Sequence, residues 1–136
     1  MFRLISRPDP APLEYEVADS ETLAYGTCVK FDDAKLVAAG GTDAVAGITA
    51  QSASGGEMCK IILVDPEQIW EADLVGDGSP DADFVVGLNI ANLDTDGIGI
   101  DETVDTSDNN TGPCSIIKID SGAKKCWVKF KLRQLT

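Results

Sequence analysis

Between residues 23 and 64 the chain is divided into short runs of β-forming residues, with turn residues about every ten positions. The runs are Thr27–Phe31, Leu36–Val37, Val45–Ala50 and Met58–Val64. The breaks contain Asp, Gly and Ser, which favour turns because they tolerate unusual backbone angles or bond to their own backbone. Short strands at this spacing are typical of small barrels and sandwiches. We therefore predict an all-β protein made of small β-barrel or sandwich lobes.

In the segment Lys125–Arg133 every second residue from Cys126 to Leu132 is apolar. Alternation with a period of two places successive side chains on opposite faces of a strand. The predicted core face carries Cys126, Val128, Phe130 and Leu132, and the outer face carries Trp127, Lys129, Lys131 and Arg133. A partner strand over Ser115–Ile119 and a four-residue loop, 120–123, would set Ile117 opposite Cys126. In that register Cys114 points away from Cys126, which argues against a disulfide between them.

The remaining pattern predicts a division into three parts. Residues 1–20 form an arm, residues 21–64 an N-terminal β lobe, and residues 65–136 a C-terminal β lobe, and the two lobes either stand apart or share one core. In the C-terminal lobe, Gln68–Leu74 fits a strand or a short helix, and we favour the strand. Gly97–Asp101 is a glycine-containing strand. The predicted core residues are Trp70, Phe84, Val128 and Phe130.

The arm is predicted to be extended, because Pro8, Pro10 and Pro12 disfavour a helix. It is either a frayed terminus or a segment that becomes ordered on a partner. In the second reading its apolar anchors are Phe2, Leu4 and Ile5, and its charged anchors are Arg3 and Arg7. Removal of residues 1–7 would then leave the body folded and abolish binding.

Charge is distributed very unevenly along the chain. Residues 61–117 contain 13 acids and no Lys or Arg, whereas six of the 11 basic residues lie between Lys118 and Arg133. Such a surface is unsuited to nucleic acid, whose binding depends on Lys and Arg, and to anionic membranes. The outward basic residues of the last strand either solvate the face and protect an edge, or join Trp127 in contacting an acidic partner or the acidic flank of a neighbouring subunit.

No catalytic constellation is apparent, and we predict neither an enzyme nor a cofactor. The chain has no histidine, which excludes Ser-His and Cys-His pairs. Bare carboxylates acting as a hydrolase have no further support. The cysteines lack zinc-site spacing. The N-terminus lacks a secretory signal pattern, so we expect reduced, buried thiols; they are Cys28, Cys59, Cys114 and Cys126.

Two acidic segments are candidates for calcium binding, namely Asp77–Asp83 and Asp94–Asp96. Calcium requires six to eight oxygen ligands, which clustered carboxylates supply. Neither segment fits an EF-hand loop, because Ile98 stands where a ligand belongs. These segments support an alternative function, a calcium-dependent extracellular β module for adhesion or carbohydrate binding.

Several segments together show a pattern found in one family. They are Tyr25–Phe31 continuing to Ala46–Ala50, then Ser54–Ile61, Gly97–Ile100, Asp108–Pro113 and Lys125–Phe130. In this pattern the chain resembles the capsid decoration (cement) proteins of tailed bacteriophages. The strong acidity and the four cysteines are not part of the resemblance.

The resemblance implies a structural virion protein made in the host cytoplasm and located on the outer capsid surface. It implies a β-rich homotrimer that bridges neighbouring subunits of the major capsid protein and so stabilises an icosahedral shell. It also implies that the N-terminal arm grips the shell. We adopt this function as the leading hypothesis.

Overall fold

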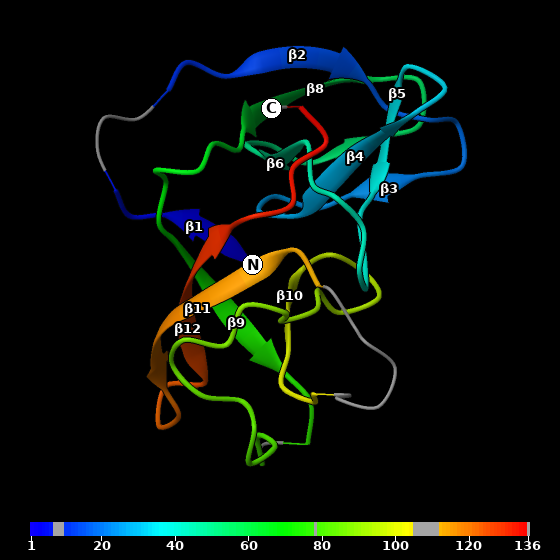
Figure 1. Ribbon diagram of the computed structural model, residues 1–136. Coiled ribbons are helices and arrows are strands. Elements are labelled where there is room, and N and C mark those ends of the chain that lie inside the picture. The colour runs from blue at the N-terminus through cyan, green and yellow to red at the C-terminus, as the bar shows by residue number, and fades with distance from the viewer. Residues whose placement is uncertain (7–9, 78, 105–111, 136) are drawn as a thin grey trace.

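The runs of β-forming residues fold into twelve strands in the part of the chain that the computed structural model describes, which comprises residues 1–6, 10–77, 79–104 and 112–135. The prediction of an all-β protein is confirmed, and these residues contain no helix. The strands form two five-stranded sheets and a two-stranded ribbon, and Figure 1 shows one sheet above the other. Both sheets are open, so the fold agrees with the sandwich alternative and not with a closed barrel.

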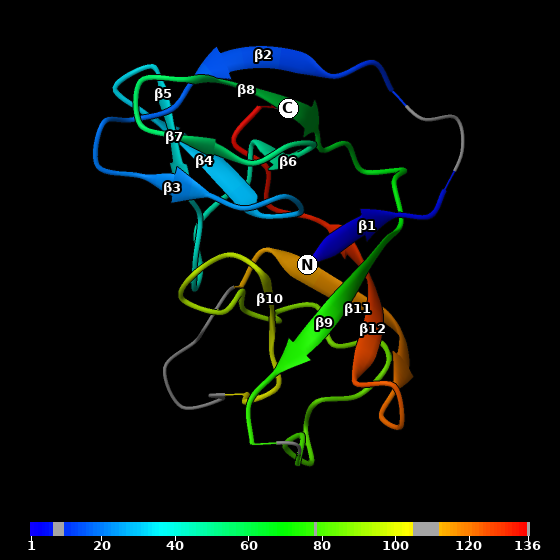
Figure 2. The same cartoon turned by 180° about the vertical axis from the view of Figure 1, so that it is seen from behind.

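The first sheet, in the upper half of Figure 1, contains the short runs from the middle of the sequence. Its order is β2 (Leu13–Glu16), β8 (Met58–Leu63), β6 (Gly47–Thr49), β4 (Cys28–Asp32) and β5 (Lys35–Ala38), with all neighbours antiparallel. The ribbon pairs β3 (Thr22–Leu23) with β7 (Ala53–Ser54) near this sheet, as Figure 2 shows from behind. All four strands predicted between residues 27 and 64 are confirmed, because β4, β5, β6 and β8 overlap them.

The second sheet joins the two ends of the chain. Its order is β1 (Phe2–Leu4), β9 (Trp70–Val75), β12 (Lys125–Phe130) and β11 (Cys114–Asp120), and the short β10 (Gly99–Asp101) runs parallel to the end of β9. The strands predicted around residues 68–74 and 97–101 are therefore confirmed as β9 and β10.

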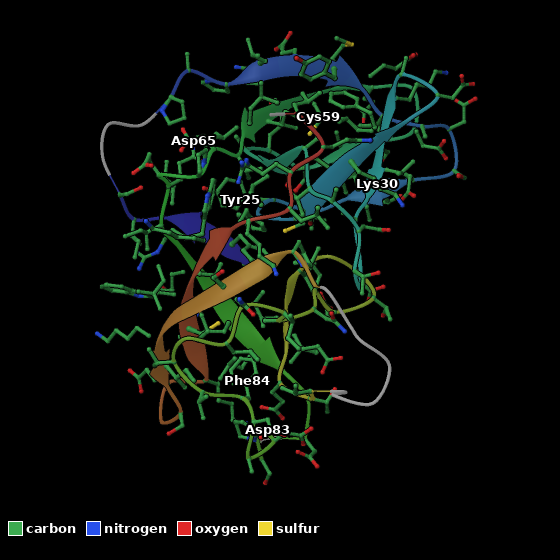
Figure 3. The ribbon with its side chains drawn as sticks, viewed as in Figure 1. Tyr25, Lys30, Cys59, Asp65, Asp83 and Phe84 are labelled. Carbon is green, nitrogen blue, oxygen red and sulfur yellow. The ribbon has the colours of Figure 1, made fainter. Side chains whose placement is uncertain are left out.

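Two clusters of buried apolar side chains lie in the described part of the chain. The larger core contains residues of both sheets, among them Phe2, Ile48, Trp70, Phe84, Val128 and Phe130. The smaller core contains Val17, Leu23, Val29, Leu36, Ala53, Cys59 and Ile61. All four predicted core residues are buried; one of them, Phe84, is labelled in the lower half of Figure 3. The two halves of the molecule thus share a core.

The described residues among the first twenty, 1–6 and 10–20, contain two strands and are not a free arm. Phe2 is 1% exposed, and its ring lies 5.7 Å from the ring of Phe130. β1 is an integral strand of the second sheet, and β2 pairs with β8 of the first. The reading of residues 1–6 as a frayed or free arm was wrong, because burying Phe2 and Leu4 within the chain is more favourable than leaving them in water. Contact of this segment with a partner stays a prediction. Removal of residues 1–7 would remove a strand.

The C-terminal hairpin forms as predicted, but its register differs from the predicted one by two residues near the turn and by one residue beyond a bulge. Ile119 lies opposite Cys126, and a bulge interrupts the pairing between Ile116 and Lys118. A bulge sets two residues opposite one, so strict alternation misplaces every side chain beyond it. Ile116 and Cys114 are consequently buried. The expectation that Cys114 points away from the core position of Cys126 was wrong, since both belong to the larger core.

The last residues leave the hairpin and cross to the first sheet. β12 ends at Phe130, and Leu132 is 40% exposed instead of buried, contrary to the prediction. The backbone N–H of Val45 donates to the carbonyl of Leu132, and that of Gln134 donates to the carbonyl of Val45. The side-chain amide of Gln134 then bonds both backbone groups of Phe31, at 2.7 and 2.9 Å. The C-terminal segment therefore ties the two sheets together.

Candidate functional site on the outer face of the second sheet

The second sheet has one face in the larger core and one face toward solvent, which we call the outer face. The inward side chains of its central strands include Trp70, Ala72, Cys126 and Val128. Their neighbours along each strand point outward. Of the predicted interface residues, Trp127 and Lys129 lie on this outer face and are partly buried.

One row of outward residues crosses all four strands, in the order Arg3, Glu71, Trp127 and Lys118. The guanidinium of Arg3 donates to the Glu71 carboxylate at 2.9 Å, and the indole N–H of Trp127 donates to the other carboxylate oxygen at 3.4 Å. The ammonium of Lys118 lies 4.5 Å from the centroid of the Trp127 ring, a cation–π contact. Trp127 is thus held between a carboxylate on one side and an ammonium on the other.

The adjacent row contains Asp73, Lys125 and Asp120. The Asp73 carboxylate accepts hydrogen bonds from the Lys125 ammonium and from the amino group of Met1. Burial raises the pKa of the Asp73 carboxyl, but these hydrogen bonds and positive charges outweigh it and leave the pKa below its usual value. The hydrogen bond to Asp73 likewise raises the pKa of Lys125.

Pairing within these rows leaves the outer face with unpaired positive charge. Arg3 and Lys125 are neutralised by Glu71 and Asp73. Among the described residues, Lys118 and Lys129 form no ion pair. The outer face therefore carries two lysines without ion pairs, offset in part by the carboxylate of Asp120, on a chain whose formal net charge is -12.

A hollow of about 240 Å³ opens on this face beside Trp127. Its lining includes Glu71, Lys118, Asp120, Lys125 and Trp127, contributed by β9, β11 and β12. Of these residues, only Trp127 was predicted from the sequence to lie at an interface. Lys118 and Lys125 belong to the same predicted hairpin. Their position next to Trp127, however, depends on the bulge in β11.

The other predicted interface residues lie elsewhere. Lys131 and Arg133 follow the end of β12, and the Arg133 guanidinium donates to the carbonyl oxygen of Phe130 at 2.8 Å. Of the predicted arm anchors, Phe2 lies in the larger core, Leu4 packs against it, and Ile5 donates its backbone N–H to Ile69. Only Arg3 reaches the outer face, and Arg7 lies outside the described residues.

The carboxylates of the calcium candidates accept hydrogen bonds from nearby backbone groups. One oxygen of Asp94 accepts from the N–H groups of Ile98 and Gly99, at 2.8 and 3.0 Å. Asp77 accepts from Ser79, and Asp81 accepts from Val104. Within the described ranges, which leave out residues 78 and 105–111, no three acidic or cysteine side chains are grouped to hold a metal ion. Here these carboxylates stabilise turns.

All four cysteines are buried free thiols, as predicted from the sequence. Burial raises the pKa of each thiol, and for Cys126 the pKa is about 12. A thiol with a raised pKa carries little reactive thiolate at neutral pH. The cysteines therefore act as small apolar core residues.

Comparison of the chain with protein-family models finds no match, and comparison with curated proteins finds none either. In the described part of the chain there is no helix able to cross a membrane.

Proposed function

We propose that this protein is a capsid decoration protein of a tailed bacteriophage. In this proposal it binds the outer surface of an icosahedral shell, bridges neighbouring major capsid protein subunits and stabilises them without catalysing a reaction. Its partners are the major capsid protein and further copies of itself.

One observation carries the proposal: the segments that resemble decoration proteins are also the segments that build the sheets. Tyr25–Phe31 and Ala46–Ala50 overlap β4 and β6, Ser54–Ile61 overlaps β8, and Lys125–Phe130 is β12. The resemblance therefore falls on the structural framework and not only on turns. This agreement supports the proposal that the resemblance to decoration proteins extends over both sheets of the chain.

The shared core gives the proposed clamp a physical basis. Because both sheets pack into one core and Gln134 ties the C-terminal segment to β4, surfaces on the two halves keep a fixed spacing. A protein–protein interface of ordinary size buries on the order of 1,600 Å². Several such contacts made at once strengthen attachment by avidity. A rigid, multivalent body can thus hold neighbouring shell subunits together.

The proposal is tested by sedimentation with expanded empty capsids of the phage that encodes the chain. We expect the purified protein to sediment with the capsids, to saturate at a fixed ratio to the major capsid protein, and to be displaced by excess unlabelled protein. Capsids carrying it should also resist heating better than bare capsids, because a ligand of the assembled state stabilises that state.

A control protein of similar size and net charge should stay in the supernatant, which separates specific binding from trapping. Binding that does not saturate, or no binding at any concentration, would refute the proposed function.

A further inference from the structure

The hollow beside Trp127 has a balanced set of charges. The charged side chains in its lining are two carboxylates and two ammonium groups, which belong to Glu71, Asp120, Lys118 and Lys125. Their formal charges cancel, so the lining gives no net attraction to a cation or to an anion. A charged ligand would also lose part of its hydration on entering the hollow, which is costly without an opposite charge in excess. The lining therefore favours a small neutral molecule.

The same four groups require a ligand that both donates and accepts hydrogen bonds. Carboxylates only accept and ammonium groups only donate. One oxygen of Asp120 accepts from the backbone N–H of Ala123 at 3.1 Å, which leaves its second oxygen available. Lys118 forms no ion pair with any described residue. A hydroxyl group donates and accepts at once, so a molecule with several hydroxyls satisfies both kinds of group.

Trp127 adds an aromatic surface at the same place. Its indole N–H donates to Glu71 at 3.4 Å, which holds the ring in position. The ammonium of Lys118, an exposed residue, lies 4.5 Å from the ring centroid, so one ring face is open to a group outside the core. An aromatic face is electron-rich and attracts groups of positive or partly positive charge. The C–H groups on one side of a sugar ring are partly positive and can take this position.

We propose that this hollow binds a neutral pyranose sugar. One side of the sugar ring packs against Trp127, and its hydroxyl groups bond the Asp120 carboxylate and the Lys118 ammonium. Sites for drug-sized ligands enclose about 300–1,000 Å³, so a hollow of about 240 Å³ suits a single sugar residue. Its described lining includes no residue of Asp77–Asp83 or Asp94–Asp96, so this binding needs no calcium.

This inference adds a ligand to the proposed function and does not rest on capsid attachment. Sugar binding is measured on the free protein, so the two proposals can fail separately. A protein that binds a sugar but ignores capsids would refute only the proposed function. A protein that binds capsids but no sugar would refute only the inference.

The test is titration of the purified full chain with glucose, galactose, mannose and N-acetylglucosamine, followed by tryptophan fluorescence. Trp70 is 1% exposed in the larger core, so a change on binding reports on Trp127. We expect at least one sugar to give a saturable change in the millimolar range, because a shallow site that covers one side of a ligand binds weakly. The change should persist with EDTA, and it should be equal at ~0.15 M and ~1 M salt, since a neutral ligand is not screened.

A matched pair of variants locates the site. Ala123→Leu fills the hollow from an exposed position in the hairpin turn and leaves the charged groups in place, so it should abolish the saturable change. Ala24→Leu makes the same substitution at an exposed position in the lining of another hollow, of about 480 Å³, and should bind like the wild type. Circular dichroism verifies that both variants fold.

A third variant, Trp127→Leu, tests the stacking surface. Because it lacks the reporting fluorophore, its binding is followed by saturation-transfer NMR of the sugar C–H protons, and we expect the transfer seen with the wild type to disappear. No saturable change with any of the four sugars would overturn the inference. So would a change that EDTA abolishes, or equal binding by the wild type and the Ala123→Leu variant.

Discussion

The two cores of this molecule differ in which parts of the chain they join. The smaller core has seven buried residues, all between Val17 and Ile61, and belongs to the first sheet and its ribbon. The larger core has 17, and it brings Phe2 and Phe130 together with Cys28 and Ile48 of the first sheet. The smaller core buries too little apolar surface to stabilise a separate lobe by itself. The first sheet therefore depends on side chains supplied by the second sheet and both ends of the chain.

This difference predicts a single cooperative unfolding transition for both sheets. Tryptophan fluorescence reports on the second sheet, since Trp70 lies on β9 and Trp127 on β12, whereas circular dichroism reports on all strands. Coincident transitions by both methods are the mark of two-state unfolding. Contacts that join the two sheets should therefore maintain this coupling.

The largest effect is expected from Phe2→Ala. Phe2 is 1% exposed and packs against Phe130, so truncation leaves a cavity in the larger core. Removal of a buried aromatic side chain typically costs about 3–5 kcal/mol. Urea denaturation should show that loss in the free energy of unfolding, with fluorescence and circular dichroism still coincident.

The matched control is Leu13→Ala in β2, which belongs to the same N-terminal segment but is 46% exposed. It should change stability by less than about 0.5 kcal/mol, as surface substitutions usually do. Equal, small effects at both positions would show that Phe2 is not a core residue. They would support the interpretation of the N-terminal segment as a free arm.

The sequence predicted the parts of this fold that depend on local pattern. The β-forming runs gave β4, β5, β6 and β8, and alternation placed Cys126, Val128 and Phe130 inside. Both signals arise from neighbouring residues along one strand, which is why a single sequence carries them.

The features that the sequence did not predict depend on contacts between distant segments. Nothing in Phe2–Leu4 alone indicates that β9 is its partner, because strand pairing is set by the whole sheet. The bulge at Ile117 is one extra residue that leaves no mark on periodicity, yet it determines whether Cys114 is buried and where Lys118 lies. The hollow beside Trp127 escaped prediction for the same reason, since its charged residues come from three strands.

A smaller effect is expected from Gln134→Ala, which cuts the tie between the C-terminal segment and the first sheet. The Gln134 amide accepts from the N–H of Phe31 and donates to its carbonyl. These bonds are exposed, so water replaces part of what is lost, and the cost should be about 1 kcal/mol. Native-state hydrogen exchange should show faster exchange at Phe31.

Gln134→Glu is the control, because it keeps an acceptor for the Phe31 N–H but replaces the donor with a carboxylate oxygen, which must turn away from the Phe31 carbonyl. It should lose less stability than the alanine variant and leave the exchange of Phe31 slow. If both variants exchange like the wild type, the side-chain bridge does not hold β4 to the C-terminal segment.

The smallest effect concerns Asp43, which closes the loop that carries Val45 into the larger core. Its carboxylate accepts from the Lys30 ammonium at 2.9 Å and from the Gly40 N–H at 3.1 Å. Burial raises the pKa of Asp43, but the hydrogen bonds from Lys30 and Gly40 and the charge of Lys30 leave it below the usual 3.8. A lowered pKa means that the ionised carboxylate stabilises the fold above the unfolded-state pKa, and that this contribution is lost as pH falls through the folded-state pKa.

Asp43→Asn should therefore be less stable than the wild type at neutral pH, by less than about 1 kcal/mol because the pair is partly exposed. The difference should shrink as the pH falls below the usual pKa of 3.8, where the wild-type carboxyl becomes protonated. Urea denaturation of both proteins at neutral pH and at about pH 3 measures it, and comparing the two proteins cancels the titration of the other acids. A difference that stays constant with pH would mean that the Asp43 charge does not hold this loop, and that Val45 is kept in the larger core by packing alone.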